Sequence, residues 1–278
     1  MPDRGRLLVC ATPIGNLADV TERVLSALRD ADVVLAEDTR VTRRLLDRHG
    51  IAASLERYDE HVAHARTPAF IARLQAGETF ALVSDAGTPG VSDPGALLVD
   101  AALAAGVAVD VLPGPSAIIT ALVASGLPTH AFYFGGFLPR KAGDRARALS
   151  SVAHLDATLI FYESPHRTAA SLAALADAFP GRHAAMAREL TKLHEEVARG
   201  PLPTLAEEIA GRESLKGEVV LLVGPPPAEE SALDEEAISA ALAAHRAAGA
   251  SRAQAVKLTA AELGVGRNAV YEIALRDG

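Results

Sequence analysis

Four loops of the chain combine residue types that suit the binding of a charged ligand. They read ATPIGNLAD, AEDTR, SDAGTPGVSDPG and LPGPSA, and each stands at the end of a short apolar run. Glycine and proline let backbone groups approach a ligand closely. Ser116 and Ala117 begin a helical pattern whose free N–H groups can receive a carboxylate. Because the carboxyl ends of parallel strands lie at one edge of a sheet, the four loops predict one shared site.

The third loop does not have the spacing of a dinucleotide site. Its glycines are Gly87, Gly90 and Gly95, which do not fit the G-x-G-x-x-G fingerprint. The DPG segment at its end predicts a helix start, with Asp93 as N-cap and Pro94 in the first helical position. The loop is therefore expected to hold a ligand of another kind.

Alternating strand-like and helix-like segments predict an α/β fold. Short runs that are apolar on both faces, such as RLLVCA, DVVLA and FALVS, alternate with amphipathic helical segments, which favours a largely parallel sheet. The same rhythm continues in the second half, in segments such as TLIFYE and GEVVLLVG. We therefore expect two α/β domains, 1–120 and 121–224.

A proline-rich segment, GPPPAEES, separates these domains from an Ala-rich tail. Its composition is typical of a linker. The following segment, SRAQAVKLTAAELGVGRNAVYEIAL, predicts two helices around a turn at 264–266, which is helix-turn-helix spacing. Residues 225–278 are thus expected to form a linker and a small helical unit, which either packs on the protein or contacts nucleic acid.

Composition and charge exclude several classes of protein. The 278 residues are 49% hydrophobic and carry a formal net charge of −8, which argues against nonspecific coating of nucleic acid. The single cysteine, Cys10, cannot form an internal disulfide, and no apolar run approaches the roughly 18 residues of a membrane span. We expect a cytoplasmic protein that is neither exported nor embedded in a membrane.

Two basic clusters depart from this acidic balance. The first contains Arg40, Arg43, Arg44 and Arg48 with one acid, Asp47, and the second contains Arg140, Lys141, Arg145 and Arg147 with Asp144. A solvated helix face and a phosphate-binding surface are equally good interpretations of each cluster.

Two other constellations are weaker signals. DEHVAH has two histidines but no cysteine partner, so we expect no metal site there. ESPHR lacks the G-x-S-x-G elbow of a hydrolase, and its proline is expected to begin a helix.

Six motifs, in order, resemble one known family. TPIGNLAD, AEDTR, SDAGTPGVSDPG, PGPSA, FYESPHR and RELTKLHEE are together similar to the tetrapyrrole methylase superfamily of S-adenosylmethionine-dependent enzymes, and more narrowly to its branch that acts on ribosomal RNA. The resemblance covers about residues 7–224. It implies a homodimer of chains with two α/β domains, a donor-binding cleft between them and a small helical C-terminal domain. The implied reaction is 2′-O-methylation of a cytidine in the decoding region of 16S rRNA, free or in the small ribosomal subunit, without a metal.

The resemblance also implies roles for individual positions. The residues implied to contact the donor are Ile14, Asp85, Gly87, Thr88, Ser116, Ala117, Tyr162, Leu190 and Glu218. Where corrin-modifying relatives have a GDP loop, this chain reads SDAG, so the aspartate is kept and the turn after it differs. A carboxylate at this point suits a donor whose sulfonium is cationic. Arg167 in FYESPHR is either an RNA contact or a solvent-exposed side chain.

A ribose hydroxyl must lose its proton as it attacks, so a base near the cleft would help. The charged side chains that the motifs offer are Glu37, Asp38 and Arg40 in AEDTR, Glu163 in FYES, and Arg188, Glu189, Lys192 and Glu195 in RELTKLHEE. A carboxylate can act as the base with its ordinary pKa, whereas Lys192 can do so only if its pKa is lowered. Each of these side chains could instead belong to a structural ion pair, and the sequence does not choose among them.

Two other functions stay open at this level. One is methylation of a small tetrapyrrole-type acceptor with the same donor site. The AEDTR and FYESPHR loops and the helical tail argue against it. The other is a nonenzymatic regulator that binds nucleic acid through the tail, which would leave the four ligand-type loops unexplained.

Overall fold

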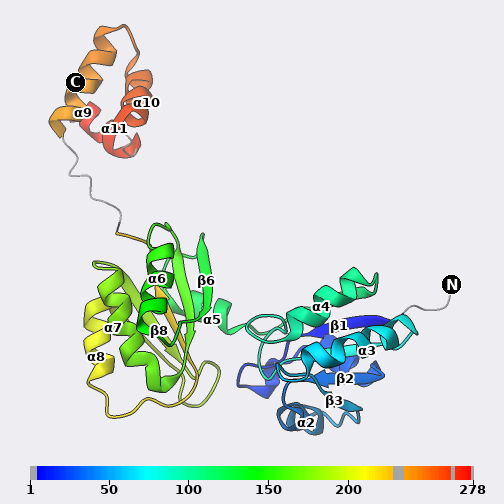
Figure 1. Ribbon diagram of the computed structural model, residues 1–278. Helices are drawn as coiled ribbons and strands as arrows, with labels where there is room; N and C mark the ends of the chain where they lie inside the picture. Colours follow the sequence, from blue (N-terminus) through cyan, green and yellow to red (C-terminus); the bar gives the residue numbers. More distant parts are fainter. Residues whose placement is uncertain (1–4, 228–234, 264–266, 277–278) are drawn as a thin grey trace. The chain divides into compact units, whose positions relative to one another are not determined.

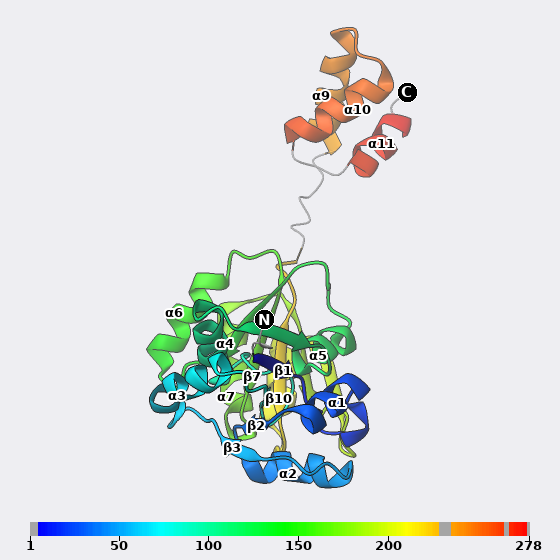
Figure 2. The same ribbon diagram turned by 90° about the vertical axis from the view of Figure 1, so that its right-hand side faces the viewer.

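The computed structural model describes residues 5–227, 235–263 and 267–276 (Figures 1 and 2). The chain forms two compact units, Met1–Pro225 and Pro226–Gly278. The first unit contains two five-stranded sheets with helices on both faces, which confirms the predicted α/β class. Within the described residues, no helix is long and apolar enough to span a bilayer.

The first sheet is parallel throughout. Its order is β3-β2-β4-β1-β5, and all four strand pairs are parallel, as the doubly apolar strands predict. The strands are β1 (Arg6–Cys10), β2 (Val33–Ala36), β3 (Leu55–Arg57), β4 (Phe80–Val83) and β5 (Ala108–Leu112). Their carboxyl ends therefore share one edge, from which the four ligand-type loops leave.

Helices cover both faces of this sheet. On one face, α3 and α4 pack on alternate residues such as Leu7 and Leu82, and on the other α1 and α2 pack on Val34 and Ala81. The helical segments are η1 (Leu17–Asp19), α1 (Glu22–Asp30), α2 (Thr39–Arg48), α3 (Ala63–Gln75) and α4 (Gly95–Ala104). Cys10 is buried under α1 and α2, and burial raises the pKa of its thiol to about 12.

The second sheet is mixed, with the order β6-β7-β10-β8-β9. Only β6 and β7 pair in parallel, and the other three pairs are antiparallel. The strands are β6 (Phe132–Phe137), β7 (Thr158–Glu163), β8 (His183–Arg188), β9 (Glu196–Pro201) and β10 (Val219–Val223). The antiparallel pairing places the start of β10 beside the end of β7, where Val219 is paired with Glu163.

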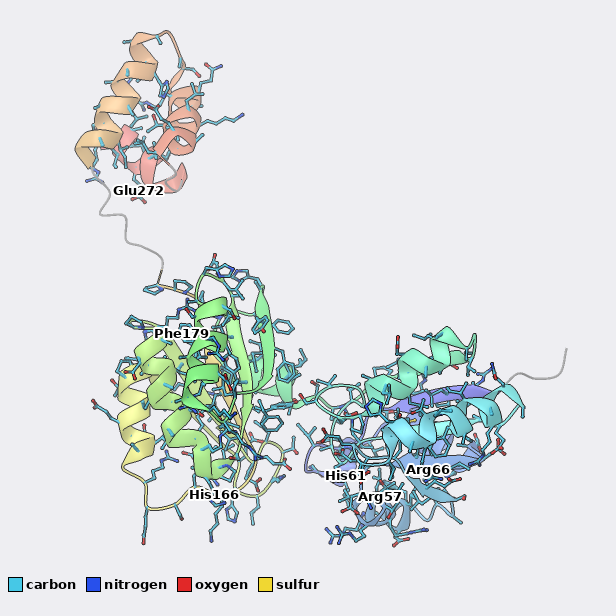
Figure 3. The ribbon with its side chains drawn as sticks, in the orientation of Figure 1. Arg57, His61, Arg66, His166, Phe179 and Glu272 are labelled. Atoms are coloured by element: carbon cyan, nitrogen blue, oxygen red, sulfur yellow. The ribbon has the colours of Figure 1, made fainter. Side chains whose placement is uncertain are left out.

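Helices also cover both faces of the second sheet. One face packs on α6, α7 and α8, with Phe179 in that core under the guanidinium of Arg182 (Figure 3). The opposite face packs on α5. The helical segments are α5 (Ala117–Ser125), α6 (Ala142–Val152), η2 (Pro165–Arg167), α7 (Thr168–Ala178) and α8 (Leu202–Ala210). Because α5 belongs to the packing of the second sheet yet spans residue 120, the division at 120/121 stays a prediction.

The second unit contains α9 (Glu235–Ala247), α10 (Arg252–Leu263) and α11 (Arg267–Arg276). Ile238, Val256 and Ile273, one from each helix, share its apolar core. The last two helices are those predicted from the tail sequence, whereas the predicted turn at 264–266 lies outside the described residues, as do residues 228–231 of the predicted linker.

Candidate functional site

A cavity of about 540 Å³ lies in the first unit, where the carboxyl-end loops of the first sheet face the second sheet. This size is within the usual range for small-molecule sites. Its walls include the predicted positions Ile14, Asp85, Gly87, Thr88, Ser116, Ala117, Tyr162, Glu163 and Glu218. Five of the six motifs thus contribute to one cavity although they are far apart in the sequence, whereas no residue of RELTKLHEE (188–196) is among those that line it.

The loop after β4 is fixed by backbone contacts. Gly87 exchanges two backbone hydrogen bonds with Thr12, of 2.8 and 3.0 Å, and its φ of +77° is one that L side chains rarely adopt. Further along, an Asp93 carboxylate oxygen accepts the N–H groups of Gly90 and Gly95 at 2.8 and 2.7 Å. The Asp93 carboxylate therefore ties the loop to the start of α4, but the predicted cap was wrong by one residue, because α4 begins at Gly95 and its N-cap is Pro94, which has no side-chain cap hydrogen bond.

The start of α5 is an N-terminus that opens on the cavity. The Ser116 hydroxyl accepts the N–H of Ile119, so Ser116 is the N-cap, as predicted. Ser116, Ala117 and Ile118 all line the cavity. A helix N-terminus carries partial positive charge and favours an anionic group.

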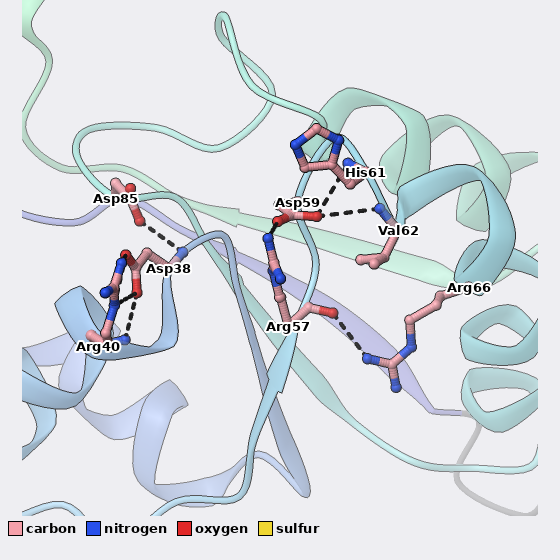
Figure 4. Close-up of polar contacts among 8 residues, drawn as sticks. All are labelled: Asp38, Arg40, Arg57, Asp59, His61, Val62, Arg66 and Asp85. Carbon is pink, nitrogen blue, oxygen red and sulfur yellow. Dashed lines mark hydrogen bonds and ion pairs between the residues drawn. The ribbon is translucent and has the colours of Figure 1, made fainter.

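Carboxylates gather at the rim formed by the first sheet (Figure 4). An Asp85 oxygen accepts the backbone N–H of Asp38 at 2.9 Å, and the Asp38 carboxylate forms an ion pair of 2.6 Å with Arg40. Hydrogen bonds from Arg40 lower the pKa of Asp38 to about 2, whereas burial raises the pKa of Asp85. Asp38 itself is not among the residues that line the cavity.

The loop after β3 is held by its own polar contacts (Figures 3 and 4). Asp59 pairs with Arg57 and accepts the backbone N–H groups of His61 and Val62. Within the described residues, no group of three or more His, Cys, Asp and Glu side chains could hold a metal ion. The contacts of Asp59 with Arg57, His61 and Val62 fix the backbone of this loop.

Glu163 is engaged by neighbours inside the second half. Its side chain is fully buried and accepts the Ser164 N–H at 2.8 Å and the Ser171 hydroxyl at 2.5 Å. Arg167 forms an ion pair of 3.1 Å with it and donates to the Leu138 carbonyl at 2.6 Å. Removing one partner of such a buried pair typically costs about 3–5 kcal/mol. Both Glu163 and Arg167 thus have structural contacts, and their predicted roles in chemistry and RNA binding stay predictions.

A loop after β8 connects the two halves of the first unit. Glu189 and Thr191 have φ values of +52° and +66°, and the Thr191 hydroxyl accepts the Asn16 N–H at 3.1 Å. Gly15 packs so closely here that a Cβ atom would lie 2.6 Å from Cγ of Lys192. Leu190 is buried in the same core as Ile14 and α5, behind the cavity wall.

Lys192 lies between two carboxylates. Its ammonium is 2.8 Å from Glu189 and 3.1 Å from the exposed Glu218. Burial disfavours the charged ammonium, but the hydrogen bonds to Glu189 and Glu218 outweigh it and raise the pKa of Lys192. This direction is opposite to the lowered pKa that a lysine base requires.

The predicted basic clusters lie on exposed surfaces. Arg40, Arg43 and Arg44 are exposed on α2, whose N-terminus adjoins the cavity rim. Arg140 and Lys141 are exposed at the start of α6. Their positions leave both interpretations, solvated face or phosphate contact, open.

The structure adds residues to the site that motif reading did not assign. Phe137, Val219 and Val220 line the cavity, and the Phe137 ring packs against Tyr162 with centroids 5.5 Å apart. Burial raises the pKa of Tyr162. The segment GEVVLLVG was predicted as a strand. Its position beside β7, which brings Val219 and Val220 to the cavity, depends on strand order and cannot be predicted from local sequence.

Comparison with solved structures finds the same architecture. The methyltransferase CobJ matches with a TM-score of 0.61 at 24% identity, over 80% of this chain and 94% of that one. Uroporphyrin-III C-methyltransferase from Thermus thermophilus, complexed with S-adenyl homocysteine, matches with a TM-score of 0.56 at 20% identity, over 79% and 97%. At these identities the likeness concerns the fold.

Sequence comparison is more specific. The family model described as Tetrapyrrole (Corrin/Porphyrin) Methylases matches residues 6–206. Two proteins named Ribosomal RNA small subunit methyltransferase I are similar to the chain: that of Mesorhizobium japonicum, 49% identical over 91% of this chain and 87% of the relative, and that of Xylella fastidiosa, 46% identical over 98% and 99%. The chain therefore belongs to the tetrapyrrole methylase family, as its motifs and its cavity indicated.

Proposed function

We propose that this protein transfers a methyl group from S-adenosylmethionine to small-subunit ribosomal RNA, and that the acceptor is the 2′-hydroxyl of a cytidine in the decoding region of 16S rRNA. The observation that carries the proposal is the near full-length similarity to proteins named Ribosomal RNA small subunit methyltransferase I, at 42–49% identity. The cavity formed by the motif loops supports it, and we propose that the protein works in the cytoplasm.

The cavity fits this donor in size and in chemistry. The N–H groups at the start of α5 suit the methionine carboxylate. Asp85, in the loop after β4, suits a cationic sulfonium. Gly87, Thr88 and Tyr162 complete the walls on which the donor would rest. The donor supplies an activated methyl group, so the chain's main task is to align the acceptor oxygen with it.

The proposed acceptor can be tested by mapping ribose methylation. Purified protein, S-adenosylmethionine and unmethylated small subunits, or free 16S rRNA, should give one new 2′-O-methylcytidine in the decoding region, detected by mass spectrometry of nuclease fragments. Supplying subunits and free RNA separately identifies the true substrate. Methylation of a tetrapyrrole but of neither RNA substrate would contradict the proposal and favour the small-acceptor alternative.

Gly87→Val should abolish donor binding without unfolding the protein. Valine at a φ of +77° strains the loop that lines the cavity, and its side chain extends toward Ile14, already 3.7 Å from the position of a Cβ. Calorimetry with S-adenosylmethionine and circular dichroism measure the two effects. Gly50→Val is the matched control, because Gly50 has a φ of +62°, has no atom within 4 Å of its Cβ position and lies just after the C-terminal end of α2. Normal affinity for S-adenosylmethionine in folded Gly87→Val protein would show that the donor does not bind at this loop.

We propose that the exposed basic cluster on α2 contacts RNA phosphates. Replacing Arg40, Arg43 and Arg44 with Gln should weaken RNA binding and flatten the slope of log K against log salt by about 2, because about 0.7 of a counterion is released per phosphate contact in single strands. Donor affinity should not change. Arg23→Gln with Arg29→Gln, on the exposed side of α1, is the control. If the slope of log K against log salt is unchanged, the three arginines contact solvent and not RNA.

We propose that the protein is a homodimer through the two α/β domains. Apolar side chains are exposed on the edge strands β5 and β6 and on α5, including Val111, Phe132 and Val123, the last with 69% of its surface exposed. Edge strands and apolar patches of this kind are usually covered in solution. We assign the tail to RNA binding.

The tail has the charge expected of an RNA-binding unit. From His245 to Gly278 the sequence has five Arg and Lys residues and three Asp and Glu residues, a net charge of +2 in an acidic chain. The proline-rich linker would let this unit reach a large substrate.

Truncation after Gly224 should leave a dimer that binds S-adenosylmethionine normally but has a raised KM for the ribosomal substrate. Analytical ultracentrifugation, calorimetry and steady-state kinetics report the three properties. Full-length protein with Arg252→Gln and Lys257→Gln, both on α10, should raise the KM in the same direction. If the truncated protein methylates normally but loses its solubility or its dimer, the tail packs on the protein and does not bind RNA.

A further inference from the structure

Glu37 lies where a proton acceptor is needed. It directly follows β2 and lines the cavity beside Asp85. The Asp85 N–H is 3.5 Å from one carboxylate oxygen of Glu37, which is the outer limit of a hydrogen bond. Among the described residues, no ion pair involves Glu37. Its carboxylate is therefore still available to a hydrogen-bond donor in the cavity.

The other candidate carboxylates already have hydrogen-bond or ion-pair partners, and Glu195 accepts the Thr191 N–H at 2.6 Å. The Asp38 carboxylate is paired with Arg40 and lies off the cavity wall, and Glu189 is paired with Lys192. The oxygens of Glu163 accept two hydrogen bonds besides the ion pair with Arg167. An ion pair lowers the basicity of a carboxylate, so these groups are poorer proton acceptors than an unpaired one.

The charged side chains that shift the pKa of Glu37 are carboxylates. Burial is the largest cause that raises the pKa of Glu37, and Asp85, after β4, is the next. Asp93, before α4, and Asp59, after β3, raise this pKa further, while the hydrogen bond from the Asp85 N–H lowers it. The elements around Glu37 thus increase its proton affinity, which a general base near neutral pH needs.

We propose that Glu37 is the general base of the methyl transfer and accepts the proton of the acceptor ribose hydroxyl. This inference rests on the proposed function. The hydroxyl O–H bond breaks and its proton goes to a carboxylate oxygen of Glu37. The freed electron pair of the oxygen forms the new O–CH₃ bond, while the pair of the old C–S bond stays on sulfur and neutralises the sulfonium. Glu37 releases the proton to solvent after the product leaves.

The test is single-turnover methylation of small subunits at saturating donor and RNA. Glu37→Gln should lower the rate constant by about 10²–10⁴-fold, the usual contribution of general base catalysis, with the donor and RNA affinities unchanged. Glu37→Asp should recover part of the rate because it keeps the carboxylate. Glu60→Gln, a like substitution at an exposed position after β3, is the matched control and should have the wild-type rate.

The pH profile separates a base from a structural residue. A base must be deprotonated, so the wild-type rate should fall as the pH drops through the raised pKa of Glu37, and Glu37→Gln should lack this acidic limb. In the donor-free protein, the carboxyl ¹³C resonance that Glu37→Gln removes should titrate above the ordinary glutamate range, which needs no activity to measure. A Glu37→Gln rate within threefold of wild type, or an unaltered acidic limb, would overturn the assignment.

The outcomes also distinguish this inference from the proposed function. If wild-type protein methylates the ribosomal substrate and Glu37→Gln does so equally well, the function stands and only the base is wrong. If wild-type protein binds S-adenosylmethionine but methylates no ribosomal RNA, the function fails and the assignment of Glu37 fails with it.

Discussion

The pair of backbone hydrogen bonds between Thr12 and Gly87 is the contact on which the site depends. It joins the loops after β1 and β4, which leave neighbouring strands of the first sheet. The Thr12 hydroxyl adds a bond of 3.2 Å to the Ser84 carbonyl. These two loops together form one wall of the cavity. From this wall Asp85 accepts the Asp38 N–H of the loop after β2, and the start of α5 forms another wall. A pre-formed site of this kind orders little on binding, which favours affinity.

The second constraint is that α5 belongs to two structures at once. Its first residues follow the last strand of the parallel sheet and line the cavity, while Ile118, Ala121 and Leu122 pack on the second sheet. Burying side chains the size of Ile118 and Leu122 fully contributes roughly 1.5–3 kcal/mol each. The contact between Asn16 and Thr191 joins the halves at another point. The walls of the cavity are therefore held by the same packing that joins the two α/β halves.

Local sequence was enough to predict much of this arrangement. Strands that are apolar on both faces predicted the parallel sheet, and the loops at their ends predicted the site, because strand direction alone brings those ends together. The mixed order of the second sheet was not predictable, since β10 pairs with β7 across more than 50 residues of sequence. For the same reason Val220 and Phe137 were missed. Motifs also do not show which carboxylates are paired. Only the structure shows that Asp38 is paired with Arg40 away from the cavity wall, while Glu37 lines the cavity.

The central claim is that the cavity between the two sheets holds the methyl donor. A crystal structure of the protein with S-adenosylhomocysteine tests it most directly. The account predicts the ligand in this cavity, with its carboxylate at the N–H groups that follow Ser116, its sulfur near Asp85 and Gly87, and Tyr162 against its opposite side. Ligand density elsewhere on the chain, with the cavity filled only by water, would contradict the account.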